Sequence, residues 1–155
     1  MMKQVLTIVL FAAFLGLSSC NSKSNDKDLQ SKVETLKQIL DAFNRHDLDG
    51  IMAFFTDDCS FDFPRGSEPW GQRFLGKAQV REAIAGRFKG IPNVHYSDAT
   101  QWVAGDRGVS EWLLSGTKTS GESVKVRICI LWEFKYGKIS RMDTYWKIVE
   151  QPTGI

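Results

Sequence analysis

Two carboxylates, Glu111 and Asp62, are the strongest candidates for acid–base chemistry in this sequence. Glu111 alternates with Val109 and Leu113 in a segment that is typical of a β-strand. If that side of the strand faces the core, the loss of hydration favours the protonated acid, and Glu111 would exchange a proton near neutral pH. Asp62 lies two residues before Pro64, where a register slip or β-bulge would turn it inward. We therefore predict Glu111 and Asp62 as catalytic residues.

Both carboxylates also have an ordinary structural interpretation. Glu111 would pair with Arg127 or Lys125 if its side of the strand were solvated, and Asp62 would be an outward residue of an edge strand. A lone histidine such as His95, at the beginning of a strand, is more often structural than catalytic. These alternatives predict no acid–base site.

The sequence argues against several other kinds of site. It has no Cys/His cluster with metal spacing, no phosphate-binding glycine loop and no Gly-x-Ser-x-Gly sequence, so we expect neither a metal nor another cofactor. The 20 Lys and Arg residues are interleaved with 18 Asp and Glu residues, which predicts no nucleic-acid partner. Cys59 and Cys129 lie in apolar segments, where they would be buried thiols or a disulfide pair.

The beginning of the chain resembles the leader of a bacterial lipoprotein. Lys3 precedes an apolar run over residues 5–17, which is shorter than the roughly 20 residues that span a bilayer. The run ends in Leu17-Ser18-Ser19-Cys20, which is similar to a lipobox, whose cysteine receives a diacylglyceryl group. An ordinary secretory signal that contains a cysteine is the alternative.

This resemblance implies a location and a division of the chain. We expect residues 1–19 to be a signal peptide and Cys20 to be the lipidated N-terminus, which would be the only contact with a membrane. The domain would then lie in the cell envelope, in the periplasm or at the cell surface. Residues 20–30 are polar and predict a flexible tether. Residues 31–150 have the usual length of one domain.

The domain begins with a helical pattern and continues with strands. Ser31–Glu34 is a capping box, and apolar residues then recur at steps of three and four. We expect helices over residues 31–45, 47–55 and 76–90. A short strand over 59–63 ends at a proline, and turn sequences divide residues 94–148 into four long strands. The prediction is an α+β fold, with three N-terminal helices packed on the concave face of a curved, mostly antiparallel sheet.

Four segments together resemble the SnoaL-like branch of the nuclear transport factor 2-like superfamily. They are residues 42–50, the strand–proline–loop–glycine–helix over 61–84, the WLLSGT strand over 112–117 and residues 134–145. The resemblance covers residues 31–148 and implies a cone-shaped roll around a deep, mostly apolar pocket. Members include ketosteroid isomerases, limonene epoxide hydrolase, polyketide cyclases and many proteins with no demonstrated activity.

The catalytic residues of two of these enzymes are not matched. A ketosteroid isomerase has a carboxylate base, a tyrosine and a protonated aspartate, at positions that correspond here to Phe63, Ile39, and Ile130 or Leu131. Limonene epoxide hydrolase has an arginine and two aspartates, where this chain has Glu111, Leu113 and Thr144. Asp62 lies one residue before the position of the isomerase base. We therefore expect neither reaction by the known route.

The predicted register gives an apolar and aromatic pocket with a few hydroxyl groups. Its lining is Phe63, Leu113, Ser115, Val126, Ile128, Ile130, Met142, Thr144 and Trp146. Such a lining suits a small hydrophobic molecule. The leading hypothesis is a lipid-anchored domain that binds a small apolar or amphipathic molecule. The alternatives are a hydrolase or isomerase-like enzyme that uses Glu111 and Asp62, and a non-catalytic structural or assembly module.

The convex face of the sheet predicts an assembly state. Its outward residues alternate between polar and apolar side chains, such as Leu131, Arg141 and Tyr145. A sheet face of this kind is not expected to stay bare, and a symmetric pair is the simplest way to cover it. We therefore expect a homodimer.

Overall fold

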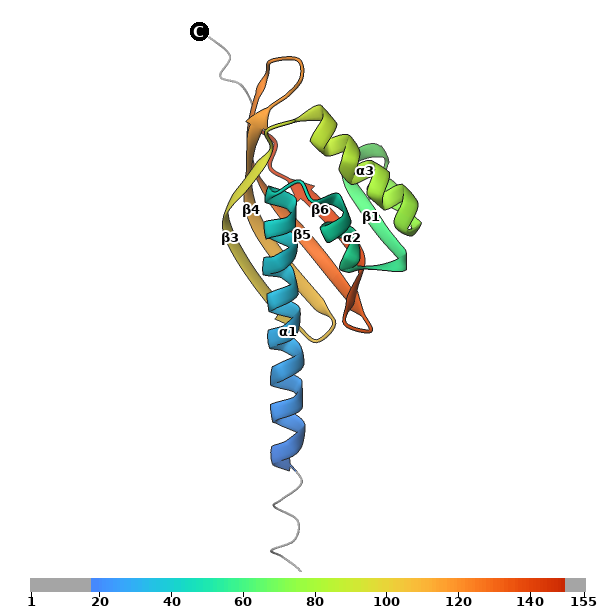
Figure 1. The fold of residues 1–155 in the computed structure, drawn as a ribbon, viewed down its shortest axis with the longest axis vertical. Helices are drawn as coiled ribbons and strands as arrows, with labels where there is room; N and C mark the ends of the chain where they lie inside the picture. The colour runs from blue at the N-terminus through green and yellow to red at the C-terminus, as the bar shows by residue number, and fades with distance from the viewer. Residues whose placement is uncertain (1–17, 150–155) are drawn as a thin grey trace, which may run out of the picture.

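The computed structural model describes residues 18–149, with side chains from residue 25. The order of elements is α1 (Ser18–Asn44), α2 (Leu48–Ala53), β1 (Phe55–Glu68), β2 (Gly71–Leu75), α3 (Gly76–Gly90), β3 (His95–Ala104), β4 (Arg107–Thr117), β5 (Ser123–Lys135) and β6 (Lys138–Trp146). The strands form one curved sheet, and the helices cover one face of it (Figure 1). The predicted α+β architecture is therefore confirmed.

The sheet has the strand order β2-β1-β6-β5-β4-β3. All neighbouring strands are antiparallel except β1 and β6, which are parallel. This pairing places the first strand of the chain beside the last one. We call the helix-covered, concave side of the sheet the inner face and the opposite side the outer face.

The helix α1 begins earlier than the sequence predicts. It begins at Ser18 rather than at Ser31, so residues 20–30 are helical and not a flexible tether. Residues 25–30 are exposed apart from the half-buried Leu29, because the first turns of α1 extend past the sheet (Figure 1). Lys32 stabilises this part of the helix through Asp28 one turn earlier, at 2.6 Å, and through Asp106 in the β3–β4 turn, at 2.7 Å. Among residues 18–149, no helix is long and apolar enough to cross a membrane.

The segment after the first strand is a hairpin and not the loop that its composition predicts. β1 continues to Glu68 and pairs with β2, with an irregular register between Phe63 and Glu68. Gly71 permits this tight packing because it has a positive φ of 79° and a Cβ atom at this position would collide with the carbonyl oxygen of Phe63. The hairpin brings Arg73 opposite Asp62, which the sequence analysis did not foresee.

The core lies on the inner face of the sheet. The side of β4 that faces the core is the opposite of the predicted one. Ser110, Trp112 and Leu114 are fully buried under the helices, whereas Glu111 and Leu113 point to the outer face. The predicted register of β4 is therefore wrong by one residue. The strand carries apolar residues on both sides, and the larger Trp112 packs against Phe43, Tyr96 and Trp132, with ring centroids 5.4–6.1 Å away.

Candidate functional site

The interior of the cone holds a small cavity between α1, α3 and the inner face. Its volume is about 20 Å³, and its lining is Phe43, Phe61, Ile84, Arg87, Tyr96, Trp112, Ile128, Ile130, Met142 and Thr144. A cavity of this size admits about one water molecule. The deep pocket that the resemblance implies is thus narrowed by the aromatic side chains of the core.

A much larger space, the end hollow, is lined by the β4–β5 hairpin, the β1–β2 hairpin and the end of β6. The β4–β5 hairpin lies at the top of Figure 1. Its volume is about 880 Å³. The apolar part of its lining comes from Phe63, Trp70, Val124, Val126, Trp146 and Ile148. Thr144 lines both the end hollow and the interior cavity, so the two spaces adjoin at this residue.

Arg87 of α3 lies where the two spaces adjoin. Its guanidinium carbon lies 4.9 Å from the ring centre of Trp146 and 5.1 Å from that of Phe63, so cation–π contacts hold the side chain in place. Within residues 25–149, Arg87 takes part in no ion pair with a carboxylate. Burial raises the pKa of the Tyr96 phenol, although the charge and hydrogen bond of Arg87 act in the opposite direction. Arg87 is therefore a cation directed at the interior of the cone.

Three polar atoms beside Arg87 have no hydrogen-bond partner in the described part of the chain. They are the indole Nε1 of Trp112, the hydroxyl of Thr144 and the indole Nε1 of Trp146. By contrast, the Nε1 of Trp132 donates to the hydroxyl of Ser110 at 2.9 Å. A buried donor without a partner lowers stability, so such atoms are uncommon in protein interiors. Three of the five such side chains among the described residues thus border the two adjoining spaces, which marks these spaces as the candidate site.

The sequence analysis missed Arg87, Tyr96 and Trp112. A signal for Arg87 was present, because it lies three residues after Ile84 and seven after Val80, both of which are buried in α3. An arginine in the buried stripe of a helix needs an explanation. No comparable signal was present for Trp112, since the choice between the two sides of β4 depends on packing.

Glu111 does not reach either space. It lies half-buried on the outer face, opposite Thr100 of β3 and Cys129 of β5. Leu113 and Ser115 share this side of β4, so they are not part of the lining either. The other expected lining residues do border the spaces: Phe63, Val126 and Trp146 line the end hollow, Ile128, Ile130 and Met142 line the cavity, and Thr144 lines both.

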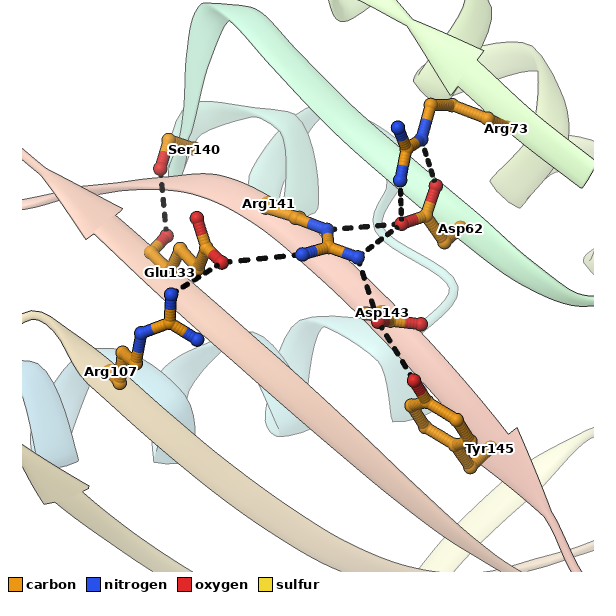
Figure 2. Close-up of polar contacts among 8 residues, drawn as sticks. All are labelled: Asp62, Arg73, Arg107, Glu133, Ser140, Arg141, Asp143 and Tyr145. Atoms are coloured by element: carbon orange, nitrogen blue, oxygen red, sulfur yellow. Dashed lines mark hydrogen bonds and ion pairs between the residues drawn. The ribbon is translucent and has the colours of Figure 1, made fainter. Parts of the chain in front are cut away.

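Asp62 also lies on the outer face, fully buried beneath two arginines (Figure 2). Arg73 donates to its two carboxylate oxygens at 2.5 and 2.8 Å, and Arg141 donates to one of them at 2.7 and 3.0 Å. Burial alone would raise the pKa of Asp62, but the hydrogen bonds and charges of both arginines outweigh it and lower that pKa. An aspartate held in this way is a structural anion and a poor general base.

The contacts of Arg141 extend this ion-pair network along the outer face (Figure 2). Arg141 also donates to Asp143 at 2.9 Å and to Glu133 at 3.3 Å, and Tyr145 donates its hydroxyl hydrogen to Asp143. Burial raises the pKa of Asp143 despite the nearby charge of Arg141. The sequence analysis expected Arg141 on the convex side but did not join it to Asp62, because that contact depends on the parallel pairing of β1 with β6.

The described residues contain no group of three or more His, Cys, Asp and Glu side chains that could hold a metal ion. Cys59 and Cys129 are unpaired, so the disulfide that we considered is not formed.

Comparison with known proteins identifies the family. A family model described as SnoaL-like domain matches residues 36–142. The chain belongs to the SnoaL-like domain family. The match covers the last third of α1, all of α2, α3 and β1–β5, and the first half of β6. Most residues that line the two spaces of this SnoaL-like domain lie in this range, whereas Thr144 and Trp146 lie just beyond it.

Solved structures share the fold of this SnoaL-like domain. A candidate polyketide cyclase from Xanthomonas campestris pv. campestris has a TM-score of 0.70 and 19% identity over 77% of this chain and 93% of its own. A candidate isomerase from Bacillus subtilis has a TM-score of 0.66 and 21% identity over 76% and 87%. TerC, co-crystallised with polyporic acid, also has a TM-score of 0.66 and 21% identity, over 76% and 92%. No curated protein matches the chain.

Proposed function

We propose that this SnoaL-like domain binds a small, largely apolar molecule in the end hollow. The observation that carries the proposal is the size and lining of this space. Its volume of about 880 Å³ lies within the ~300–1,000 Å³ that is usual for small-molecule sites. Aromatic and aliphatic side chains such as Phe63, Val126 and Trp146 give it an apolar wall, and charged side chains complete the lining.

Binding is better supported than acid–base catalysis. In the interior cavity the ionisable side chains are Arg87 and Tyr96, and neither accepts a proton readily near neutral pH. The end hollow does border Asp143, but this carboxylate already accepts hydrogen bonds from Arg141 and Tyr145. A proton shuttle through Glu111 and Asp62 is excluded, since both lie on the outer face. TerC, with its polyporic acid, shares the fold and is consistent with a binding role.

The test is to identify small molecules that copurify with the full chain by mass spectrometry. Val124→Trp would fill part of the end hollow and should remove the bound species. Val33→Trp makes the same change on a half-exposed position of α1, away from the end hollow, and should retain them. If both variants carry the same molecules as the wild type, the end hollow is not the binding site.

We also propose that the domain is anchored to a membrane of the cell envelope through Cys20. The lipobox-like sequence Leu17–Cys20 supports this anchor. Residues 1–17 lie outside the described part of the chain. With α1 helical from Ser18, the anchor would be followed by a rigid spacer of ~20 Å up to Ser31. Cys20→Ser in a chain without residues 1–19 should appear in the soluble fraction. Equal partition with membranes would refute the anchor.

We also propose that two copies of the domain form a homodimer through the outer face. Two apolar or aromatic side chains, Leu131 and Tyr145, are 40% and 54% exposed beside the ion-pair network. A twofold partner would cover both at once. Light scattering of residues 21–155 should give the mass of a dimer, and Leu131→Glu should give that of a monomer. A wild-type monomer at tens of micromolar would refute this proposal.

A further inference from the structure

The candidate site offers hydrogen-bond donors and positive charge that the chain itself does not satisfy. Arg87 is half-buried between the rings of Phe63 and Trp146 and has no carboxylate partner among residues 25–149. Trp112 and Thr144 are 0% and 3% exposed, line the interior cavity and carry polar atoms without partners. An indole nitrogen can only donate, so the groups around this space require acceptor atoms.

The rim of the end hollow is positively charged, like Arg87. Arg65, Lys125 and Lys147 line it, and none of them forms an ion pair within the described residues. Its two acidic residues are already neutralised: Glu122 by Lys118 at 2.8 Å, and Asp143 by Arg141 at 2.9 Å. The unpaired charge in the lining is therefore positive. A positive rim attracts an anion and raises its local concentration.

Arg65 and Arg87 both contact Trp146. The guanidinium carbon of Arg65 lies 5.4 Å from the Trp146 ring centre, and that of Arg87 lies 4.9 Å from it. A cation–π contact uses the face of the guanidinium and not its N–H groups, so both arginines can still donate to a ligand, Arg87 with the N–H groups that its hydrogen bond to Tyr96 does not use. Donors of this kind bind carboxylate, sulfonate or enolate oxygens strongly.

We propose that the ligand of this SnoaL-like domain is an organic anion, with an apolar body in the end hollow and its acidic group at Arg87. This inference rests on the proposed function and adds the chemical class of the ligand. A neutral apolar ligand would bury Arg87 without compensating its charge, and a cationic one would oppose it. An anion compensates the charge of Arg87, and Thr144, which borders both spaces, offers it a hydroxyl donor.

The test compares two fluorescent probes with the same ring system on the full chain. 8-Anilinonaphthalene-1-sulfonate carries one negative charge, and N-phenyl-1-naphthylamine lacks the sulfonate. We expect saturable one-to-one binding of both dyes by the wild type. Arg87→Met should weaken binding of the sulfonate about 10- to 100-fold, as for the loss of a charge-assisted contact, and change binding of the neutral dye less than about threefold.

Arg81→Met is the matched control. Arg81 is on the same helix and pairs with Asp49 at 2.6 Å, outside the site, so its loss should leave both affinities unchanged. If Arg87→Met does not fold, as judged by its circular dichroism, salt provides an independent test on the wild type. Raising the salt concentration should weaken the binding of the sulfonate dye and leave the binding of the neutral dye unchanged.

The outcomes separate the two proposals. Equal effects of Arg87→Met or of salt on both dyes would overturn the anionic class while leaving a binding site in the end hollow. If neither dye binds the wild type saturably, the proposed function itself fails.

Discussion

Polar side chains on the outer face of the sheet have hydrogen-bond partners, whereas several on the inner face have none. Strand β6 contributes residues to both faces. On the outer face, Asp62 accepts hydrogen bonds from Arg73 and Arg141, and Asp143 joins this network by accepting from Arg141. On the inner face, the next residue, Thr144, has a buried hydroxyl without a partner. A polar group that stabilises the fold finds its partner inside the chain, whereas one without a partner lowers stability. The comparison indicates that the outer network is structural and that the inner groups serve a bound molecule.

The largest effect should come from breaking the outer network. Asp62→Asn removes the charge that holds Arg73 and Arg141 together on the outer face. We expect a loss of about 2–3 kcal/mol in the free energy of unfolding, somewhat less than for a fully buried pair, because both arginines remain partly open to water. Denaturant unfolding followed by circular dichroism measures this loss.

Asp57→Asn is the matched control for this substitution. Asp57 is on the same strand but its ion pair with Lys77 is long, at 3.4 Å, and the carboxylate is 96% exposed. Its replacement should leave the free energy of unfolding unchanged. If the two variants unfold alike, the network on the outer face does not stabilise the fold.

The pH dependence of unfolding should separate the two aspartates of the network. The pKa of Asp62 is lowered from 3.8, so its stabilising effect is fully present above about pH 4 and disappears as the pH falls through its lower folded value. The stability difference between wild type and Asp62→Asn should therefore shrink in acid.

Asp143 should show the opposite dependence, because burial raises its pKa above 3.8. Its ionised form destabilises the fold relative to the protonated form, so its contribution falls as the pH rises from about 3.8 through its raised folded value. The stability of Asp143→Asn relative to wild type should rise over the same range. Unfolding curves from pH 2 to 7 measure both differences, and parallel pH profiles for the two variants would contradict the assigned directions.

Removal of an unpartnered polar group from the inner face should have a smaller effect on stability, and it should stabilise the domain. Thr144→Val keeps the shape of the side chain and removes a buried hydroxyl without a partner, so it should stabilise the domain by about 1 kcal/mol. Ser110→Ala is the counterpart, because Ser110 accepts from Trp132 and its loss should destabilise the domain by about 1 kcal/mol. Melting curves compare the two variants. If Thr144→Val melted below the wild type, the hydroxyl would have a partner.

The sequence predicted most helices and strands, because their periods and turn signals are local, but it missed β2 and the early beginning of α1. Helix α3 lies over the predicted residues 76–90, and the alternation in β5 places Val126, Ile128 and Ile130 on the inner face as expected. The register of β4 could not be predicted in the same way. Val109 and Leu113 compete with Trp112 and Leu114 for the core, and only the packing of the large Trp112 ring decides between them.

The site was less predictable than the fold, since its parts come from distant segments. Asp62 was a candidate base as long as Arg73 was assigned to a loop, and pairing with β2 is what turns it into an ion-paired residue. Arg87 becomes notable only when Phe63 and Trp146 are brought beside it. A residue whose role depends on long-range partners leaves little trace in local spacing.

The resonances of the tryptophan side chains test the central claim most directly. The indole N–H groups of Trp112 and Trp146 lack partners in the described structure, whereas that of Trp132 is bound to Ser110 and serves as an internal control. A titration of the ¹⁵N-labelled chain with 8-anilinonaphthalene-1-sulfonate should shift the indole signals of Trp112 and Trp146 and leave that of Trp132 in place. If the exposed Trp102, which borders neither space, shifted while Trp112 and Trp146 did not, the dye would bind elsewhere and the account of the inner face would be wrong.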